Sequence, residues 1–180
     1  MDRYLLVPGR GTPTPEHWLR RWARAHPEYR WAPEPPSPPL VLRDRIAALH
    51  REVNADDKPV VLIAHSAGCI TTVVWASTHH PGPVRAALLV TPPDVDGAEP
   101  DDPSDLPWRV PTTPLPFPTI LVASRTDPHC AYERSVLYAR DWGAELVDAG
   151  DAGHLDTASG YGPWPAGERL LDRLGRDLSP

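Results

Sequence analysis

The sequence predicts an α/β fold in which a mostly parallel sheet is covered by helices on both faces. Short apolar and β-branched runs alternate along the chain with longer segments whose apolar residues recur at helical spacing. The apolar runs are nearly continuous, which is typical of strands that are buried on both sides. The chain has 180 residues, so we expect one domain over residues 1–180, built on one core.

The first part of the chain predicts one strand followed by two helices. Residues 3–8 form an apolar run that ends at a Pro-Gly pair, which indicates a strand and a turn. A helix is expected over 15–26, because a proline stands near its start and Trp18, Trp22 and Ala25 share one face. After a proline-rich loop at 33–39, apolar residues at positions 42, 46, 49 and 53 predict an amphipathic helix.

Strands and helices alternate more regularly in the rest of the chain. Each expected strand is an apolar run, and the expected helices end at turn residues such as Gly143. The segment 94–116 is rich in Pro and Asp and has little periodicity, so we expect a loop near the active site. The strands are expected at 59–64, 84–91, 119–123 and 145–147, and the helices at 66–77, 131–142 and 167–178.

Composition excludes several classes of function. The net charge of −6, without a basic cluster, argues against nucleic acid or an anionic membrane as partner, and nothing in the sequence implies a partner protein. No signal peptide or membrane-spanning run is recognisable, and two cysteines form no disulfide framework, so a cytoplasmic location is expected. No histidine pair has metal-binding spacing, so neither a metal site nor a cofactor is expected.

Three residues with hydrolytic chemistry follow predicted strands. Ser66 follows the strand at 59–64 within the run AHSAG, Asp127 follows the strand at 119–123, and His154 follows the strand at 145–147. The carboxyl ends of parallel strands meet at one edge of a sheet, and the order Ser, Asp, His is that of α/β-hydrolases. A serine hydroxyl needs an imidazole to take its proton, and the imidazole needs an acceptor that orients it. We therefore expect a catalytic triad.

Other interpretations of these residues stay open. Ser66 could simply cap a helix, and Ala64 stands where the G-x-S-x-G pattern has its first glycine. Asp148 and Asp151 are alternatives to Asp127 as the acid. His65 is a rival histidine, although a packed or hydrogen-bonded core role suits it better.

Four motifs together resemble a known family. The runs VPGRGTPTPEHWLRRW, AHSAGC, PLPFPTILVASRTDPHC and GDAGHLDTASGYGPWPAGERLL, which begin at residues 7, 64, 114 and 150, are similar to small bacterial serine hydrolases related to retinoblastoma-binding protein 9. The resemblance covers nearly the whole chain and implies a compact α/β-hydrolase with a reduced sheet and no large cap domain. It also implies Ser66 as nucleophile, Asp127 as acid and His154 as base.

The oxyanion and substrate contacts are expected from two loops. The amide of Ala67 stands at a helix N-terminus, and the loop after the first strand supplies a second amide from Gly9 or Arg10. Where relatives often carry Trp, this chain has Arg10, which suggests selection of an anionic substrate; alternatively Arg10 points to solvent or pairs with an acid. Trp108, in the long loop, is a further candidate for the pocket.

These observations predict a serine hydrolase that acts on a small ester, thioester or amide through a Ser-His-Asp triad and an acyl-enzyme. The partner is then a small-molecule acyl substrate. Two alternatives remain: an acyltransferase or cyclase that uses the same acyl-enzyme, and a non-catalytic binding module on the hydrolase fold.

Overall fold

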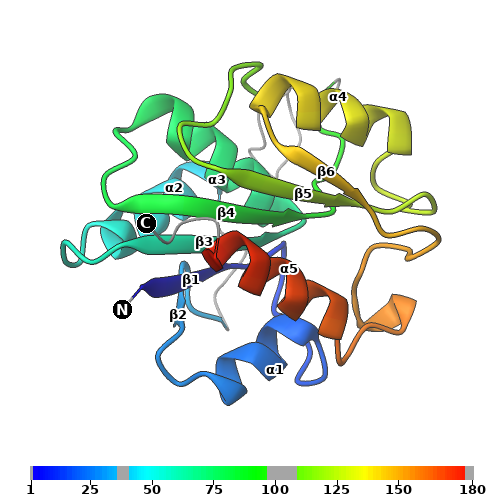
Figure 1. Ribbon diagram of the computed structural model, residues 1–180, viewed down its shortest axis with the longest axis horizontal. Coiled ribbons are helices and arrows are strands. Elements are labelled where there is room, and N and C mark those ends of the chain that lie inside the picture. The colour runs from blue at the N-terminus through cyan, green and yellow to red at the C-terminus, as the bar shows by residue number, and fades with distance from the viewer. Residues whose placement is uncertain (1, 36–40, 97–108, 177–180) are drawn as a thin grey trace.

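One parallel sheet organises the protein. In the computed structural model, which describes residues 2–35, 41–96 and 109–176, six strands pair in the order β2-β1-β3-β4-β5-β6 (Figure 1). Every neighbouring pair is parallel, as the continuous apolar runs predict. The strands are β1 (Arg3–Val7), β2 (Arg30–Trp31), β3 (Val60–His65), β4 (Val84–Val90), β5 (Thr119–Ala123) and β6 (Glu145–Asp148).

Helices cover both faces of the sheet, so the predicted fold class is confirmed. One face packs against α2, α3 and α4, and the other against α1 and α5 (Figure 1). A short 3-10 helix, η1, lies between β6 and α5. The helices are α1 (Trp18–Ala25), α2 (Leu42–Val53), α3 (Ala67–Thr78), α4 (Tyr132–Trp142), η1 (Thr157–Ser159) and α5 (Pro165–Arg176).

The central strand β3 shows how the core is divided. Leu62 and Ala64 face the layer of α2, α3 and α4, whereas Val61 and Ile63 face the layer of α1 and α5. All six residues of β3 are buried. Burial of one large aliphatic side chain contributes about 1.5–3 kcal/mol, so β3 is a stable base for the turn that follows it.

The predicted elements and the observed ones differ in a few places. Strand β2 was not predicted, because two residues are too few to form an apolar run and the strand exists through its pairing with Leu5 and Leu6 of β1. Helix α1 begins at Trp18 and not at residue 15, since His17 Nδ1 caps it by accepting a hydrogen bond from the amide of Leu19 at 3.2 Å. Helix α5 begins earlier than predicted, at a proline in the first helical position.

The long Pro/Asp-rich segment is anchored where the structure describes it. The amide of Asp94 donates to His129 O at 2.8 Å, and Trp142 Nε1 donates to Pro111 O at 2.8 Å. Trp108 lies outside the described residues. Within the described ranges no cap domain is inserted into the fold, and no helix there has the length and apolarity to span a membrane.

Candidate active site

Ser66 occupies a strained turn between β3 and α3. Its backbone has φ 55° and ψ −125°, a combination that a residue with a side chain rarely adopts. Gly68 lets the start of α3 lie against the end of β1, because a Cβ there would lie 2.1 Å from Val7 O and 2.8 Å from Pro8 O. Ala64, in place of the first glycine of the pattern, is fully buried, and its methyl group packs into the core. The departure at this position is therefore accommodated.

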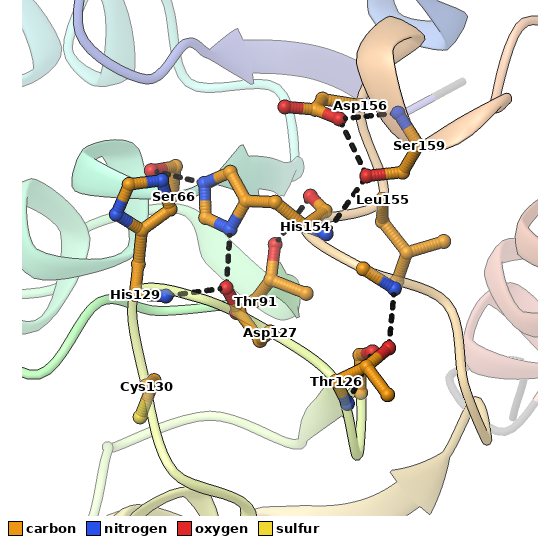
Figure 2. A network of polar contacts seen from close by, with 12 residues as sticks. Ser66, Thr91, Thr126, Asp127, His129, Cys130, His154, Leu155, Asp156 and Ser159 are labelled. Carbon is orange, nitrogen blue, oxygen red and sulfur yellow. Dashed lines mark hydrogen bonds and ion pairs between the residues drawn. The ribbon is translucent and has the colours of Figure 1, made fainter.

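The structure brings Ser66, His154 and Asp127 into contact. Ser66 Oγ lies 2.8 Å from His154 Nε2, and Asp127 Oδ1 lies 2.9 Å from His154 Nδ1 (Figure 2). A carboxylate can only accept, so Nδ1 carries the proton that it donates to Asp127. In the neutral imidazole Nε2 is then free to accept from the serine hydroxyl. This is the geometry in which an imidazole can take the proton of an attacking serine.

The two alternative acids lie elsewhere. The Asp148 carboxylate contacts the Arg125 guanidinium at 2.6 Å and accepts from the amide of Gly150 at 2.8 Å. The Gly150 amide and, next, the Arg125 side chain lower the pKa of Asp148. Asp151 is exposed to solvent. Of the three carboxylates, the structure places that of Asp127 beside the imidazole of His154.

Asp127 is fixed from a second direction. Its Oδ1 also accepts from the amide of His129 at 2.9 Å, and its side chain is only 3% exposed. The His129 ring packs edge-on against the ring of His154, with centroids 4.4 Å apart (Figure 2). The carboxylate therefore keeps its orientation without help from solvent.

The loop that carries His154 is held through its backbone. His154 O lies 2.9 Å from His65 Nε2. It also accepts from the Thr91 hydroxyl at 3.2 Å, and the amide of His154 donates to Ser159 Oγ at 3.0 Å (Figure 2). The next carbonyl, of Leu155, accepts from Trp18 Nε1 at 2.9 Å. Four hydrogen bonds thus position the base.

His65 has the structural role that was expected. Burial is the main cause that lowers its pKa, to about 3, so His65 is neutral at ordinary pH. A carbonyl cannot donate, so His65 Nε2 carries a proton and donates it to His154 O. The same effect of burial lowers the pKa of His17, whose ring lies 4.9 Å from that of His65, to about 4.

The loop after β1 runs beside Ser66. A Cβ on Gly9 would lie 3.0 Å from Ser66 Cβ, which is tighter than most Cβ contacts, so glycine lets the loop lie this close to the serine without a shift of either residue. Arg10 is exposed and lines the same cleft, and Ala67 begins α3 directly after the serine. Three of the four predicted oxyanion and substrate residues therefore line the cleft at Ser66, whereas the fourth, Trp108, falls outside the described residues.

The cleft at Ser66 has a volume of about 440 Å³. Its described walls contain small, hydroxyl-bearing and imidazole side chains, with one cation and one carboxylate. No aliphatic side chain larger than proline, and no Phe, Tyr or Trp, lines the described part of the cleft. The lining residues away from the triad are Gly9, Arg10, Gly11, Thr12, Pro13, Thr14, His17, His65, Ala67, Pro93, His129, Asp156, Thr157 and Ala158.

Sequence reasoning missed two supports of the site, Thr91 and Arg45. Thr91 has φ 47°, unusual for a β-branched residue, and its position at the end of β4 was the available signal. Arg45 is 5% exposed and sits between Leu42 and Leu49 on the buried side of α2. A charged residue inside an apolar stripe was the signal for Arg45.

No group of His, Cys, Asp or Glu residues suited to a metal ion occurs within 2–35, 41–96 and 109–176. The cysteines Cys69 and Cys130 are free and buried. Burial raises the pKa of both thiols, to about 11 for Cys130. Thiolate chemistry thus has no support at these two positions.

Comparison with known proteins points to hydrolases. The family model described as "Serine hydrolase" matches residues 4–173. A YdeN-like hydrolase from Pectobacterium atrosepticum is 30% identical, with coverage of 100% of this chain and 94% of that chain and a TM-score of 0.87. No curated protein matches the chain.

Two further solved structures share the fold at lower identity. The ydeN gene product of B. subtilis is 16% identical, with 98% of this chain and 100% of that chain covered and a TM-score of 0.76. A hydrolase of the α/β superfamily from Xanthomonas campestris is 19% identical, with 99% and 100% covered and a TM-score of 0.71. The more specific relation to retinoblastoma-binding protein 9 stays a prediction.

Proposed function

The chain belongs to the serine hydrolase family, and from this premise we propose that it cleaves small esters, thioesters or amides through an acyl-enzyme on Ser66. One observation carries the proposal: His154 lies between Ser66 Oγ and Asp127 Oδ1, at 2.8 and 2.9 Å. Each of the three side chains comes from a loop after a different strand, which is how parallel sheets assemble a site.

Acylation follows from this geometry. Ser66 Oγ attacks the carbonyl carbon of the substrate while its proton moves to His154 Nε2, and the carbonyl oxygen takes the negative charge. Asp127 stabilises the imidazolium that results. Collapse of the tetrahedral intermediate breaks the bond to the leaving group, which takes the proton from His154, and Ser66 is left as an ester.

Deacylation repeats these steps with water. A water molecule gives a proton to His154 Nε2 and attacks the acyl carbon, and the second tetrahedral intermediate releases the acid as Ser66 recovers its proton. In both halves the oxyanion is stabilised by the Ala67 amide and by the amide of Gly9 or Arg10. The close approach of Gly9 to Ser66 supports the second donor.

The cleft favours a short, polar acyl group. About 440 Å³ is the size of a small-molecule site, but the described walls lack the large apolar side chains that a long acyl chain would contact. We expect p-nitrophenyl acetate to be hydrolysed faster than p-nitrophenyl octanoate. A higher kcat/KM for the octanoate would contradict this part of the proposal.

Arg10 is the proposed selector of negative charge. It is exposed in the cleft wall, so its effect on an anionic substrate is modest, about threefold in kcat/KM. Arg10→Trp should lower kcat/KM for p-nitrophenyl hemisuccinate relative to p-nitrophenyl acetate. In wild type, 0.5 M NaCl should screen Arg10 and remove its contribution to kcat/KM for the hemisuccinate. An unchanged ratio between the two esters in Arg10→Trp would contradict the role.

The alternatives to hydrolysis are a binding module without catalytic activity and an enzyme that transfers the acyl group to an acceptor other than water. Membership of the family favours an enzyme over a binding module. The triad contacts are equally compatible with capture of the acyl group by an amine or a hydroxyl, since the cleft determines which acceptor enters. Mass spectrometry of the products, with a candidate amine present, separates acyl transfer from hydrolysis.

Replacement of the nucleophile tests the proposal. Ser66→Ala should abolish both ester hydrolysis and covalent labelling by a fluorophosphonate, in which Ser66 Oγ displaces fluoride at phosphorus and His154 takes the proton. Ser77→Ala, at an exposed serine on the same helix, should keep both. Labelling that persists in Ser66→Ala, with an unchanged circular dichroism spectrum, would overturn the assignment of the nucleophile.

A further inference from the structure

A buried cation lies behind the loop that borders Ser66. Arg45 of α2 is 5% exposed, and its guanidinium donates only to neutral oxygen atoms among its described contacts. Nη1 donates to Gly9 O at 3.2 Å, Nη2 donates to Pro8 O and, at 3.3 Å, to Gly9 O, and Nε donates to Thr71 Oγ1 at 3.1 Å. Desolvation of a cation is costly, so its placement here needs an explanation.

The carbonyls that Arg45 binds belong to the peptides that carry the candidate oxyanion amides. Pro8 O is in the same peptide unit as the amide of Gly9, and Gly9 O is in the same unit as the amide of Arg10. Both units are trans, so each N–H points away from its carbonyl and therefore away from the guanidinium. By holding the two carbonyls, Arg45 orients both amides whichever of them meets the oxyanion.

The same side chain is also connected, through the carbonyl of Ala67, to the residue that carries the other candidate oxyanion donor. Thr71 Oγ1, which accepts from Arg45 Nε, donates to Ala67 O at 3.1 Å in the first turn of α3. Helices α2 and α3 lie on the same face of the sheet (Figure 1). Arg45 thereby links the loop after β1 to the turn that presents the amide of Ala67.

We propose that Arg45 is a positioning residue for the oxyanion hole, which it orders through the carbonyls of Pro8 and Gly9 and through Thr71. This rests on the proposed serine-hydrolase function. The guanidinium also places a fixed positive charge behind the peptides that face a developing negative charge, and the contacts to their carbonyls polarise the N–H groups.

The charge persists at working pH. Burial and, next, the neighbouring Arg10 cation lower the pKa of Arg45 to about 10, which still leaves it protonated at neutral pH. A side chain that aligns the amides acts mainly in the transition state, where the oxyanion exists. Its loss should therefore reduce kcat and leave KM nearly unchanged.

Steady-state hydrolysis of p-nitrophenyl acetate tests the inference in the full-length protein. Arg45→Met keeps the aliphatic stem and should lower kcat about 100-fold, as loss of one oxyanion donor does, with KM within about twofold. Arg45→Lys keeps the charge but lacks the planar set of guanidinium donors, and it should lower kcat about tenfold. The rate of fluorophosphonate labelling should fall in parallel, whereas the midpoint of the pH–rate profile should not move. Arg43→Met, the same change at an exposed arginine of α2, should retain wild-type values.

The outcomes separate the two proposals. A folded Arg45→Met or Arg45→Lys protein with kcat within twofold of wild type overturns the positioning role and leaves the nucleophile assignment intact. A fall in kcat that comes with an equal rise in KM or a shifted pH midpoint also overturns it, because the base or the substrate site has then changed. A wild type that neither hydrolyses esters nor reacts with the fluorophosphonate overturns both. If Arg45→Met does not fold, Arg45→Lys decides by the same criteria.

Discussion

The two loops beside Ser66 are both held through their carbonyl groups, one by neutral donors and the other by a cation. On one side, the carbonyls of His154 and Leu155 accept hydrogen bonds from three neutral donors, an imidazole, a hydroxyl and an indole. On the other side, the carbonyls of Pro8 and Gly9 accept hydrogen bonds from the guanidinium of Arg45. Both loops are fixed through backbone oxygen atoms, so their side chains or amides remain free for chemistry.

The difference agrees with where charge forms in the proposed reaction. His154 becomes a cation when it takes the serine proton, so a permanent cation beside its backbone would oppose that step. The oxyanion is negative, so a permanent cation behind its donors favours it. The neutrality of His65, whose pKa burial lowers to about 3, is therefore as useful on its side as the charge of Arg45 is on the other.

The largest effect is expected from a substitution that disrupts the contact between His154 and its carboxylate. Asp127→Asn replaces an acceptor with an amide that can donate to His154 Nδ1, and so favours the tautomer with its proton on Nε2. We expect kcat for p-nitrophenyl acetate to fall by about 10⁴-fold with KM little changed. Asp151→Asn, the matched change at an exposed aspartate near His154 in sequence, should stay within twofold of wild type.

Steady-state kinetics of the two variants decide between the acids. Equal losses in Asp127→Asn and Asp151→Asn would show that the contact at 2.9 Å does not identify the functional carboxylate. Circular dichroism of both proteins should match that of wild type, because asparagine has nearly the same volume as aspartate.

A smaller effect is expected from a substitution that displaces the loop after β1, which carries a candidate oxyanion amide. In Gly68→Ala the new methyl group meets Val7 O at 2.1 Å and Pro8 O at 2.8 Å, both backbone atoms that cannot turn aside. We expect the free energy of unfolding to fall by about 3 kcal/mol and kcat to fall about 100-fold, as the loop after β1 is pushed away from α3.

Gly175→Ala is the matched control for that substitution. It is also a helical glycine, but a Cβ there meets nothing within 4 Å. Alanine should raise the free energy of unfolding by about 0.5–1 kcal/mol, because it favours helix. Urea unfolding of the two variants measures the contrast, and a stabilised Gly68→Ala would show that the approach of α3 to β1 is not tight.

The positions of Ser66, Asp127 and His154 could be predicted because each follows an apolar run, and the ends of parallel strands share one edge of the sheet. Strand β2 could not be predicted, because two residues show no periodicity and the strand is defined by its tertiary pairing with β1. The burial of Arg45 had a signal in the apolar stripe of α2, but its partners could not be predicted. It contacts carbonyls 36 and 37 residues away in sequence, and nothing local indicates which backbone a buried guanidinium meets.

The smallest expected effect tests whether the imidazole that donates to the His154 loop is neutral, through the dependence of stability on pH. Burial lowers the pKa of His65 to about 3 and that of His17 to about 4, whereas the unfolded chain has a value of about 6.5. Between these values the unfolded state binds more protons than the folded state. The contribution of the two histidines to the free energy of unfolding is therefore fully present above about pH 6.5 and is lost as the pH decreases. His65→Gln keeps a donor for His154 O and removes one titrating group.

Urea unfolding at several pH values from 7.0 to 5.0 measures this change. Wild type should lose about 2 kcal/mol over that interval from His65 alone, and His65→Gln should lose that much less. His80→Gln, at an exposed histidine, should have the wild-type slope. The same slope in His65→Gln and wild type would mean that His65 has the same pKa in the folded and the unfolded protein, and at about pH 5 a cation would then contact the loop that carries the base.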